Sequence, residues 1–143
     1  MSTLIDIFGF LSVILRGLVL VTQSFTVGGI AFLLLLAHRL GGAIGVEGGR
    51  LDVLSRQFLL WSAVAFAAAE LAFVGMQCTV LIGTVDLSLR QALGANFAVA
   101  GLVLAAAGLA IAWAVRVPFG PGVAVALGAL AVLVMVGQST TSH

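Results

Sequence analysis

The chain has no lysine, no tyrosine and a single cysteine, and only 8% of its 143 residues are charged. A soluble globular domain carries charge on about a quarter of its residues. Six arginines and five acidic residues therefore cannot cover the surface of a water-soluble domain. This shortage excludes a soluble enzyme, a nucleic-acid binder with a basic face and a disordered chain. The single cysteine excludes an internal disulfide framework, and the 62% hydrophobic composition predicts an integral membrane protein.

Four apolar runs are each long enough to cross a membrane, which takes about 20 residues for roughly 30 Å of hydrocarbon. None of them alternates as a barrel strand would. The predicted helical spans are 8–37, 58–82, 93–115 and 119–137. Because the connections between them are short, neighbouring helices must run antiparallel. The sequence therefore predicts an all-α, up-down bundle of four transmembrane helices that forms one domain over residues 1–143.

Arginines are unequally divided between the two ends of the predicted bundle. The first and third connections carry four of them, Arg39, Arg50, Arg56 and Arg116, and the other end carries Arg90. By the positive-inside rule, the arginine-rich end faces the cytoplasm. We therefore expect a multi-pass protein of a bacterial inner membrane with both termini in the periplasm.

Small residues recur along the third span at alternating spacings of four and three. The line consists of Gly94, Ala98, Gly101, Ala105, Gly108 and Ala112. A second line on the second span consists of Ala65, Ala68, Ala72 and Gly75, and the last span offers Ala124, Gly128 and Ala131. Such lines form a cofactor groove, a docking face or a packing surface within a bundle. Because helix association in lipid depends on close approach of small residues, we interpret them as packing surfaces.

Polar side chains inside the predicted spans form a second pattern. Arg16 and Gln23 lie seven residues apart on the first helix, as Glu70 and Gln77 do on the second. With the connection taken as 38–57, Gln23 is expected level with Glu70 near the midplane, and Arg16 level with Gln77. The seam is either structural, with Glu70 hydrogen-bonded to Gln23, or a proton or cation relay. A charge in hydrocarbon costs roughly 2.5–3.5 kcal/mol on insertion scales, so Glu70 is the strongest candidate for a functional residue.

Soft metal ligands are concentrated at the predicted outer end. They are Met76, Cys78, Met135 and His143. Thioether, thiolate and imidazole together favour Cu(I) over a hard cation, although Met76 and Cys78 do not share a helical face. We expect no haem, because His38 and His143 lie on opposite sides of the membrane. We also expect no enzymatic activity, since no nucleophile–base pair, phosphate loop or metal-hydrolase spacing is present.

Two segments resemble a known family. The first helix contains Leu15-Arg16-Gly17-Leu18 and then Gly28-Gly29-Ile30-Ala31-Phe32, and the chain ends in Gly137-Gln138-Ser139-Thr140-Thr141-Ser142-His143. This pattern resembles the N-terminal four-helix half of the copper resistance D (CopD-type) membrane proteins. The family's further four helices and its Trp-x-Gly-Gly-like motif have no counterpart here. The resemblance implies copper uptake or delivery at the inner membrane, with His143 and Arg16 at the positions of the family's histidine and first-helix arginine.

Three functions follow from these observations. The first is copper handling, with Cu(I) bound near Met76, Cys78 and His143. The second is a small non-catalytic subunit of a large respiratory or photosynthetic complex. The third is a proton-coupled carrier that works through Glu70. Besides the lipid bilayer, we expect a protein partner or a second copy of the chain, and no nucleic acid.

Overall fold

The computed structural model describes residues 2–37, 46–85, 88–118 and 120–141. Its helices are α1 (Ser2–Phe32), continued by a π-helical turn η1 (Leu33–Ala37), α3 (Val46–Val85), α4 (Leu89–Leu93), α5 (Asn96–Ala114) and α6 (Pro121–Thr141). Four helices are long and apolar enough to cross a membrane, over Ile7–Leu36, Gly49–Thr84, Asn96–Ala114 and Pro121–Ser139. The described residues therefore form an all-α bundle of four candidate membrane spans, as predicted.

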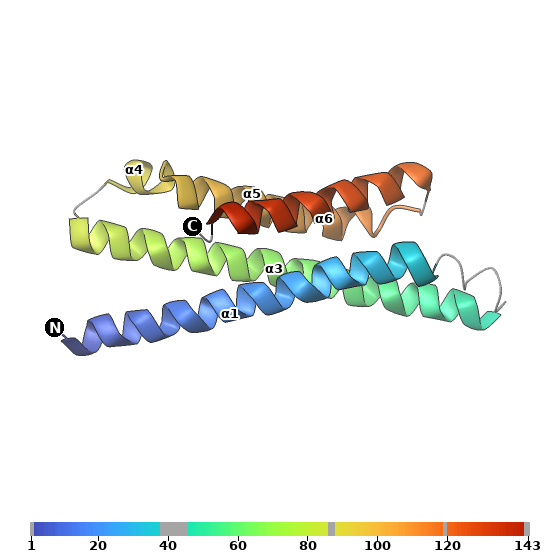
Figure 1. The fold of residues 1–143 in the computed structure, drawn as a ribbon, viewed down its shortest axis with the longest axis horizontal. Coiled ribbons are helices and arrows are strands. Elements are labelled where there is room, and N and C mark those ends of the chain that lie inside the picture. The colour runs from blue at the N-terminus through green and yellow to red at the C-terminus, as the bar shows by residue number, and fades with distance from the viewer. Residues whose placement is uncertain (1, 38–45, 86–87, 119, 142–143) are drawn as a thin grey trace.

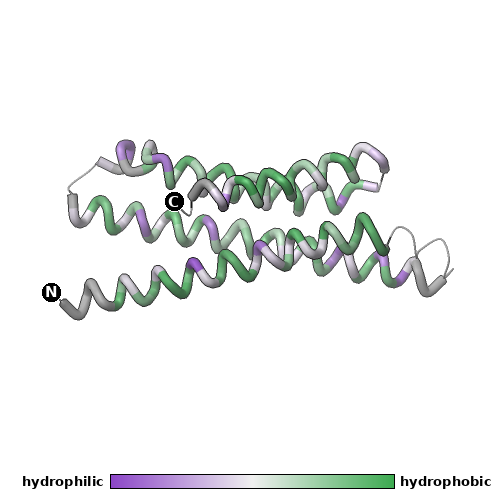
Figure 2. The backbone as a smooth tube through the Cα atoms, viewed as in Figure 1, coloured by the Kyte–Doolittle hydropathy of each residue, from purple (hydrophilic) through white to green (hydrophobic). Residues whose placement is uncertain are grey.

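The helices pack as two antiparallel pairs (Figure 1). Helix α3 packs against both α1 and α5, and α6 packs against α5 and, less extensively, against α1. Figure 2 shows that the middle of the bundle is predominantly hydrophobic and that hydrophilic residues gather toward its ends, with isolated exceptions along α1 and α3. This distribution is typical of a bundle surrounded by lipid.

The prediction of a connection over residues 38–57 is wrong in its second half. Helix α3 begins at Val46 and runs for 40 residues, which is about 60 Å at 1.5 Å per residue. The charged residues before Phe58 therefore lie within the helix, and they do not mark where the helix begins. A helix remains stable in water when its exposed turns carry charged pairs at i and i+4, and Asp52 and Arg56 form such a pair with Nε and Oδ2 3.0 Å apart.

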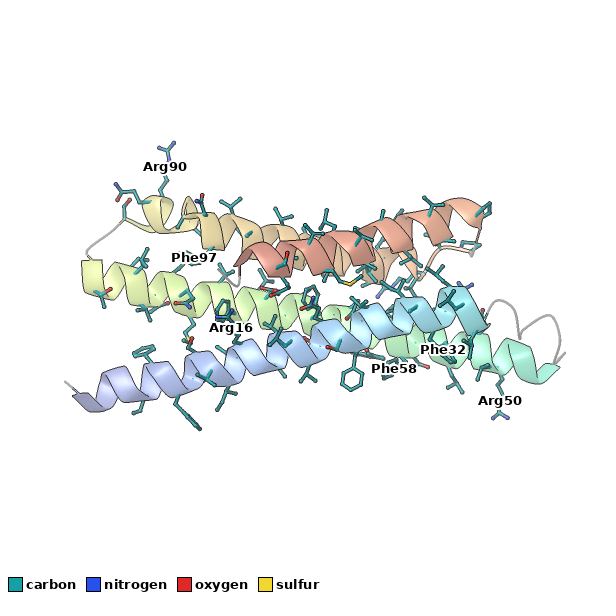
Figure 3. The ribbon with its side chains drawn as sticks, viewed as in Figure 1. Arg16, Phe32, Arg50, Phe58, Arg90 and Phe97 are labelled. Carbon is teal, nitrogen blue, oxygen red and sulfur yellow. The ribbon has the colours of Figure 1, made fainter. Side chains whose placement is uncertain are left out.

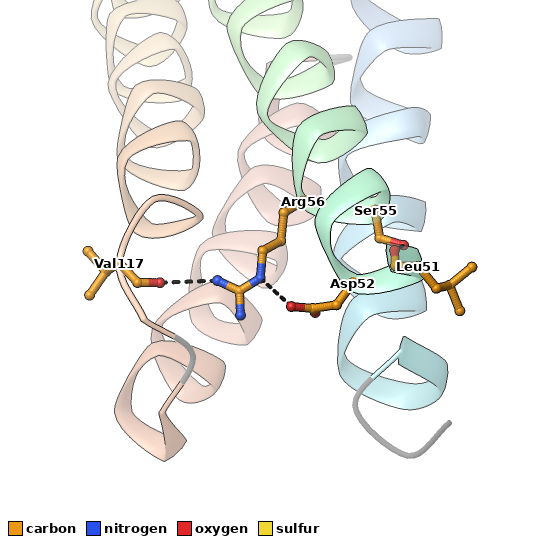
Figure 4. A network of polar contacts seen from close by, with 5 residues as sticks. All are labelled: Leu51, Asp52, Ser55, Arg56 and Val117. Atoms are coloured by element: carbon orange, nitrogen blue, oxygen red, sulfur yellow. Dashed lines mark hydrogen bonds and ion pairs between the residues drawn. The ribbon is translucent and has the colours of Figure 1, made fainter. Parts of the chain in front are cut away.

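Arg56 also connects α3 to the turn between α5 and α6 (Figure 4). Its Nη1 donates a hydrogen bond to the carbonyl oxygen of Val117, 3.3 Å away. Arg50 lies at the same end of the bundle and Arg90 at the opposite end, and both point away from it (Figure 3). The next helix begins at Pro121, which suits the first helical position because proline lacks a backbone N–H.

Glycines on α5 and α6 let the helices approach closely. A Cβ on Gly101 would overlap Val74 Cγ2, and one on Gly108 would lie 3.0 Å from Phe66 Cδ1. A Cβ on Gly137 would lie 2.8 Å from Leu104 Cδ2, so α6 packs against α5 through a glycine outside the predicted lines. From Ala98 onward the members of the predicted line on α5 are buried in the bundle, at positions 98, 101, 105, 108 and 112.

Two parts of the packing prediction are wrong. Gly94 is exposed in the turn before α5, and the whole predicted line on α3 is exposed as well: Ala65, Ala68, Ala72 and Gly75. The opposite face of α3 packs instead, through residues such as Ala63, Phe66 and Val74. Small residues recur at helical spacing on both faces of α3, and the spacing alone does not say which face meets another helix. On α6 Ala131 is buried, whereas Ala124 and Gly128 are only half-buried.

Candidate functional site

Glu70 is a buried carboxyl group within the described helices, and only 3% of its surface is exposed. It projects from the middle of α3 toward α5 and α6. Its Oε1 accepts a hydrogen bond from Gln138 Nε2 of α6, 2.5 Å away. Its Oε2 lies 3.6 Å from the place that a Cβ of Gly101 would occupy, so the close approach of α5 makes one wall of its surroundings. An ionisable group in this position within a membrane span is a functional candidate by default.

A cavity of about 330 Å³ surrounds the Glu70 carboxyl. Its polar lining comes from three helices: Arg16 of α1, Glu70 and Gln77 of α3, and Gln138 of α6. Its apolar lining consists of Val19, Phe73, Leu81, Phe97, Gly101 and Leu104. At roughly 30 Å³ per molecule, the space holds about ten waters or a small organic molecule.

The cavity lies beside the last turn of α6, to which Gln138 belongs. Helix α6 ends at Thr141, partway along α3 (Figure 1). Helices α1, α3 and α5 supply the rest of the cavity's lining. Gln138 stands one turn before the end of α6, so its amide lies at the edge of this space. The cavity thus lies toward the end of the bundle that carries α4.

The level of Glu70 along the bundle is given by its contact with α5. The carboxyl is opposite Gly101, which is five residues from the start of α5 at Asn96. That separation corresponds to about 7.5 Å, whereas the middle of α5 is at Ala105. Glu70 is therefore about 6 Å from the middle of α5, on the side of α4.

The pairing of α1 with α3 also differs from the prediction. Gly29 packs against Leu59, since a Cβ on this glycine would lie 3.1 Å from Leu59 Cδ1. Because Arg16 lies 13 residues before Gly29 and Ala72 lies 13 residues after Leu59, Arg16 is level with Ala72. Along the helix axis, the level of Arg16 is thus about 3 Å from that of Glu70, and Arg16 is not level with Gln77. The difference arises because α3 starts earlier than predicted. Each residue of α1 is therefore level with a residue of α3 that comes earlier in the chain than the predicted one.

Gln23 is not the partner of Glu70. The same register places it level with Ala65, which is about 7.5 Å from the level of Glu70. Its Oε1 is buried and has no hydrogen-bond partner within the described part of the chain. Of the four residues in the predicted seam, the structure brings Arg16, Glu70 and Gln77 to one cavity and leaves Gln23 outside its lining.

Gln138 is the residue that the sequence prediction missed. The predicted last span ends at Gly137, so Gln138 lies just outside it and is not among the predicted site residues. Helix α6 continues through Thr141, and its final turn carries the Gln138 amide back to α3. Gln138 is seven residues after the buried Ala131 and four after the buried Val134. That helical spacing is the signal that assigns it to the inner face.

The predicted soft ligands do not form a cluster in the described residues. Cys78 is buried among apolar residues of α3 and α5, with Val74 and Ala98. Met76, two residues away on α3, is half-buried on another side of the helix, and Met135 is 48% exposed on α6. Within the described ranges, no group of three or more histidine, cysteine, aspartate or glutamate residues is placed to hold a metal ion. His143 lies outside the described residues.

The polar groups of the cavity are of three kinds. They are one carboxyl group, one guanidinium group that only donates hydrogen bonds, and two amides that both donate and accept them. Comparison with protein-family models, with curated proteins and with solved structures finds no match for the chain.

Proposed function

We propose that this four-span membrane protein is a proton-coupled carrier in which Glu70 takes up and releases the proton. The observation that supports the proposal is the burial of the Glu70 carboxyl in a cavity that also contains Arg16, Gln77 and Gln138. An intramembrane carboxyl group that faces a cavity is typical of proton relays.

The hydrogen bonding of Glu70 leaves room for the proton. A buried carboxyl group without a paired cation is far less costly when it is protonated, and among the described residues no ion pair joins Arg16 to Glu70. Gln138 donates to Oε1. Oε2 beside Gly101 is therefore the atom that carries the proton, and the cavity gives that proton a path to water.

Protonation of Glu70 can be measured directly. In difference infrared spectra of the purified protein between alkaline and acidic buffer, we expect the C=O stretch of a carboxylic acid to appear on acidification. The band is expected to be absent in Glu70→Gln and retained in Asp52→Asn, whose side chain lies at the other end of α3. An unchanged spectrum in Glu70→Gln would contradict a proton on this residue. In vesicles loaded with a pH-sensitive dye, Glu70→Gln is expected to reduce proton entry to the rate of protein-free vesicles.

A second candidate is a subunit of a larger membrane complex, and the exposed line of small residues on α3 favours it. Small residues that face lipid allow another helix to approach closely, and a Cβ on Gly75 meets no atom of the bundle within 4 Å. If a partner helix occupies this face, Gly75→Leu is expected to release the chain from its complex during co-purification while the isolated chain stays folded. Co-purification equal to that of wild type would contradict a partner at this face.

Copper handling remains a prediction from the soft ligands and from the family resemblance. Its test is the copper content of the purified protein with and without added Cu(I). One copper per chain is expected, with binding weakened in Cys78→Ser and in His143→Ala. Absence of copper from the wild-type protein would contradict the prediction, and it would leave the Glu70 proposal untouched because that proposal uses different residues.

A further inference from the structure

Within the described helices, Arg16 is a cation without a partner inside a candidate membrane span. It lies between α1 and α3 (Figure 3), nine residues into the span Ile7–Leu36. Its side chain is exposed and lines the Glu70 cavity. Among the described residues it forms no hydrogen bond and no ion pair. A guanidinium group has five N–H donors, and an unpaired one is expensive at membrane depth, so the donors of Arg16 are available to a ligand that enters the cavity.

The charge of the cavity depends on the proton of Glu70. Arg16 from α1 is the one other charged group among its described lining residues. Helix α5 contributes only Phe97, Gly101 and Leu104, and α6 contributes the neutral Gln138. The thiol of Cys78 belongs to a separate apolar cluster. With Glu70 protonated the cavity therefore has a net charge of +1, and with Glu70 ionised it has none.

We infer that the cavity binds a small organic monocarboxylate together with the proton on Glu70. This inference rests on the proposed proton uptake by Glu70 and names the cargo. A guanidinium group binds a carboxylate through two parallel N–H···O bonds, and the Gln77 amide adds a further donor. Phe73, Phe97 and Leu104 form apolar walls that suit the hydrocarbon part of such a molecule. A metal cation is disfavoured, because Arg16 repels it from the only carboxylate in the cavity's described lining.

The coupling has a simple order. An ionised Glu70 competes with the ligand carboxylate for Arg16, so the ligand binds weakly. When a proton from water binds Glu70 Oε2, the carboxyl becomes neutral and the guanidinium is available to the ligand. Loss of the proton restores the competition and releases the ligand. One proton and one monoanion therefore enter and leave the cavity together, without net charge.

Isothermal titration of benzoate into the protein in phosphatidylcholine nanodiscs tests the inference. In wild type we expect uptake of one proton for each benzoate bound, measured from the dependence of the heat on the ionisation enthalpy of the buffer. Glu70→Gln imitates the protonated carboxyl, so it is expected to bind benzoate with no proton uptake and with an affinity independent of pH. Arg16→Gln is expected to weaken binding about tenfold or more, since it removes a charge-assisted pair. Arg16→Lys retains the charge and is expected to bind with intermediate affinity, and Arg90→Gln on α4 is the matched control.

Each outcome has a definite meaning. The inference would be overturned if the wild-type protein bound no benzoate, or bound it without proton uptake. It would also be overturned if Arg16→Gln and Arg90→Gln bound benzoate equally well. A second set of nanodiscs contains phosphatidylglycerol, whose phosphate is an alternative anion for Arg16. If this lipid displaces benzoate, the site belongs to a lipid headgroup and the inference of a free monocarboxylate is overturned. If benzoate binds equally well in these nanodiscs, the inference is supported. Infrared detection of a proton on Glu70 without benzoate binding would overturn the inference alone. Absence of a Glu70-dependent carboxylic acid band from the spectrum of the wild-type protein would overturn the proposed function.

Discussion

Replacing Gly101 by leucine is expected to prevent the bundle from assembling. A single Cβ at this position already overlaps Val74 Cγ2, and Gly101 is buried between α3 and α5. Overpacking by a methyl group costs typically about 1–3 kcal/mol, so Gly101→Ala is expected to lose about that much free energy of unfolding. Leucine adds three more carbons against the same wall, and its expected cost exceeds the upper end of that range.

The measurement is the fraction of monodisperse protein after detergent extraction, followed by unfolding in sodium dodecyl sulfate. Gly75→Leu is the matched control, because Gly75 is a helical glycine with nothing within 4 Å of its Cβ position. We expect the isolated control variant to unfold like wild type. If Gly101→Leu were extracted and unfolded like the control, the close contact between α3 and α5 would not exist in the membrane.

Truncating Phe66 to alanine is expected to cost about 3 kcal/mol of the free energy of unfolding. Phe66 has no exposed surface and packs in the largest apolar cluster, with Leu59 and Ile111 among its members. Phenylalanine-to-alanine changes in a core cost about 3–5 kcal/mol. We expect the lower end of that range, because lipid tails are as apolar as the bundle interior and the loss is therefore one of packing.

The control for Phe66→Ala is Trp61→Ala on the same helix. Trp61 is 64% exposed, so its removal changes contacts with lipid and is expected to change the unfolding free energy by less than about 0.5 kcal/mol. Both values come from the same unfolding titration in sodium dodecyl sulfate. An equal loss in the two variants would contradict the assignment of the Phe66 face of α3 to the bundle interior.

The sequence predicted the number of membrane-spanning helices because a membrane imposes strong requirements on each span. Each span needs about 20 apolar residues, and all backbone polar groups must be paired within the segment. The four apolar runs meet both requirements, and the short connections dictate the antiparallel order. The same argument identified Glu70 and Arg16, because a charge within such a run is visible in the sequence alone.

The register of the helices was decided by the tertiary structure. The sequence shows where the chain becomes polar, but a helix continues into water when its exposed turns are stabilised. Helix α3 therefore starts at Val46, which brings Arg16 nearly level with Glu70 and leaves Gln23 outside the cavity. The faces were decided in the same way: α3 packs through Phe66 and Val74, and its line of small residues is exposed.

The sequence by itself thus determined which residues are in the membrane, and the tertiary structure decided which of them meet. Hydrophobicity is a property of each residue and can be read along the chain. Contacts depend on where each helix begins, how far it runs and which face it presents. Gln138 illustrates the difference, because its hydrogen bond with Glu70 joins residues 68 positions apart. That bond exists because the last turn of α6 packs beside the middle of α3, and this packing cannot be read from the hydropathy of either segment.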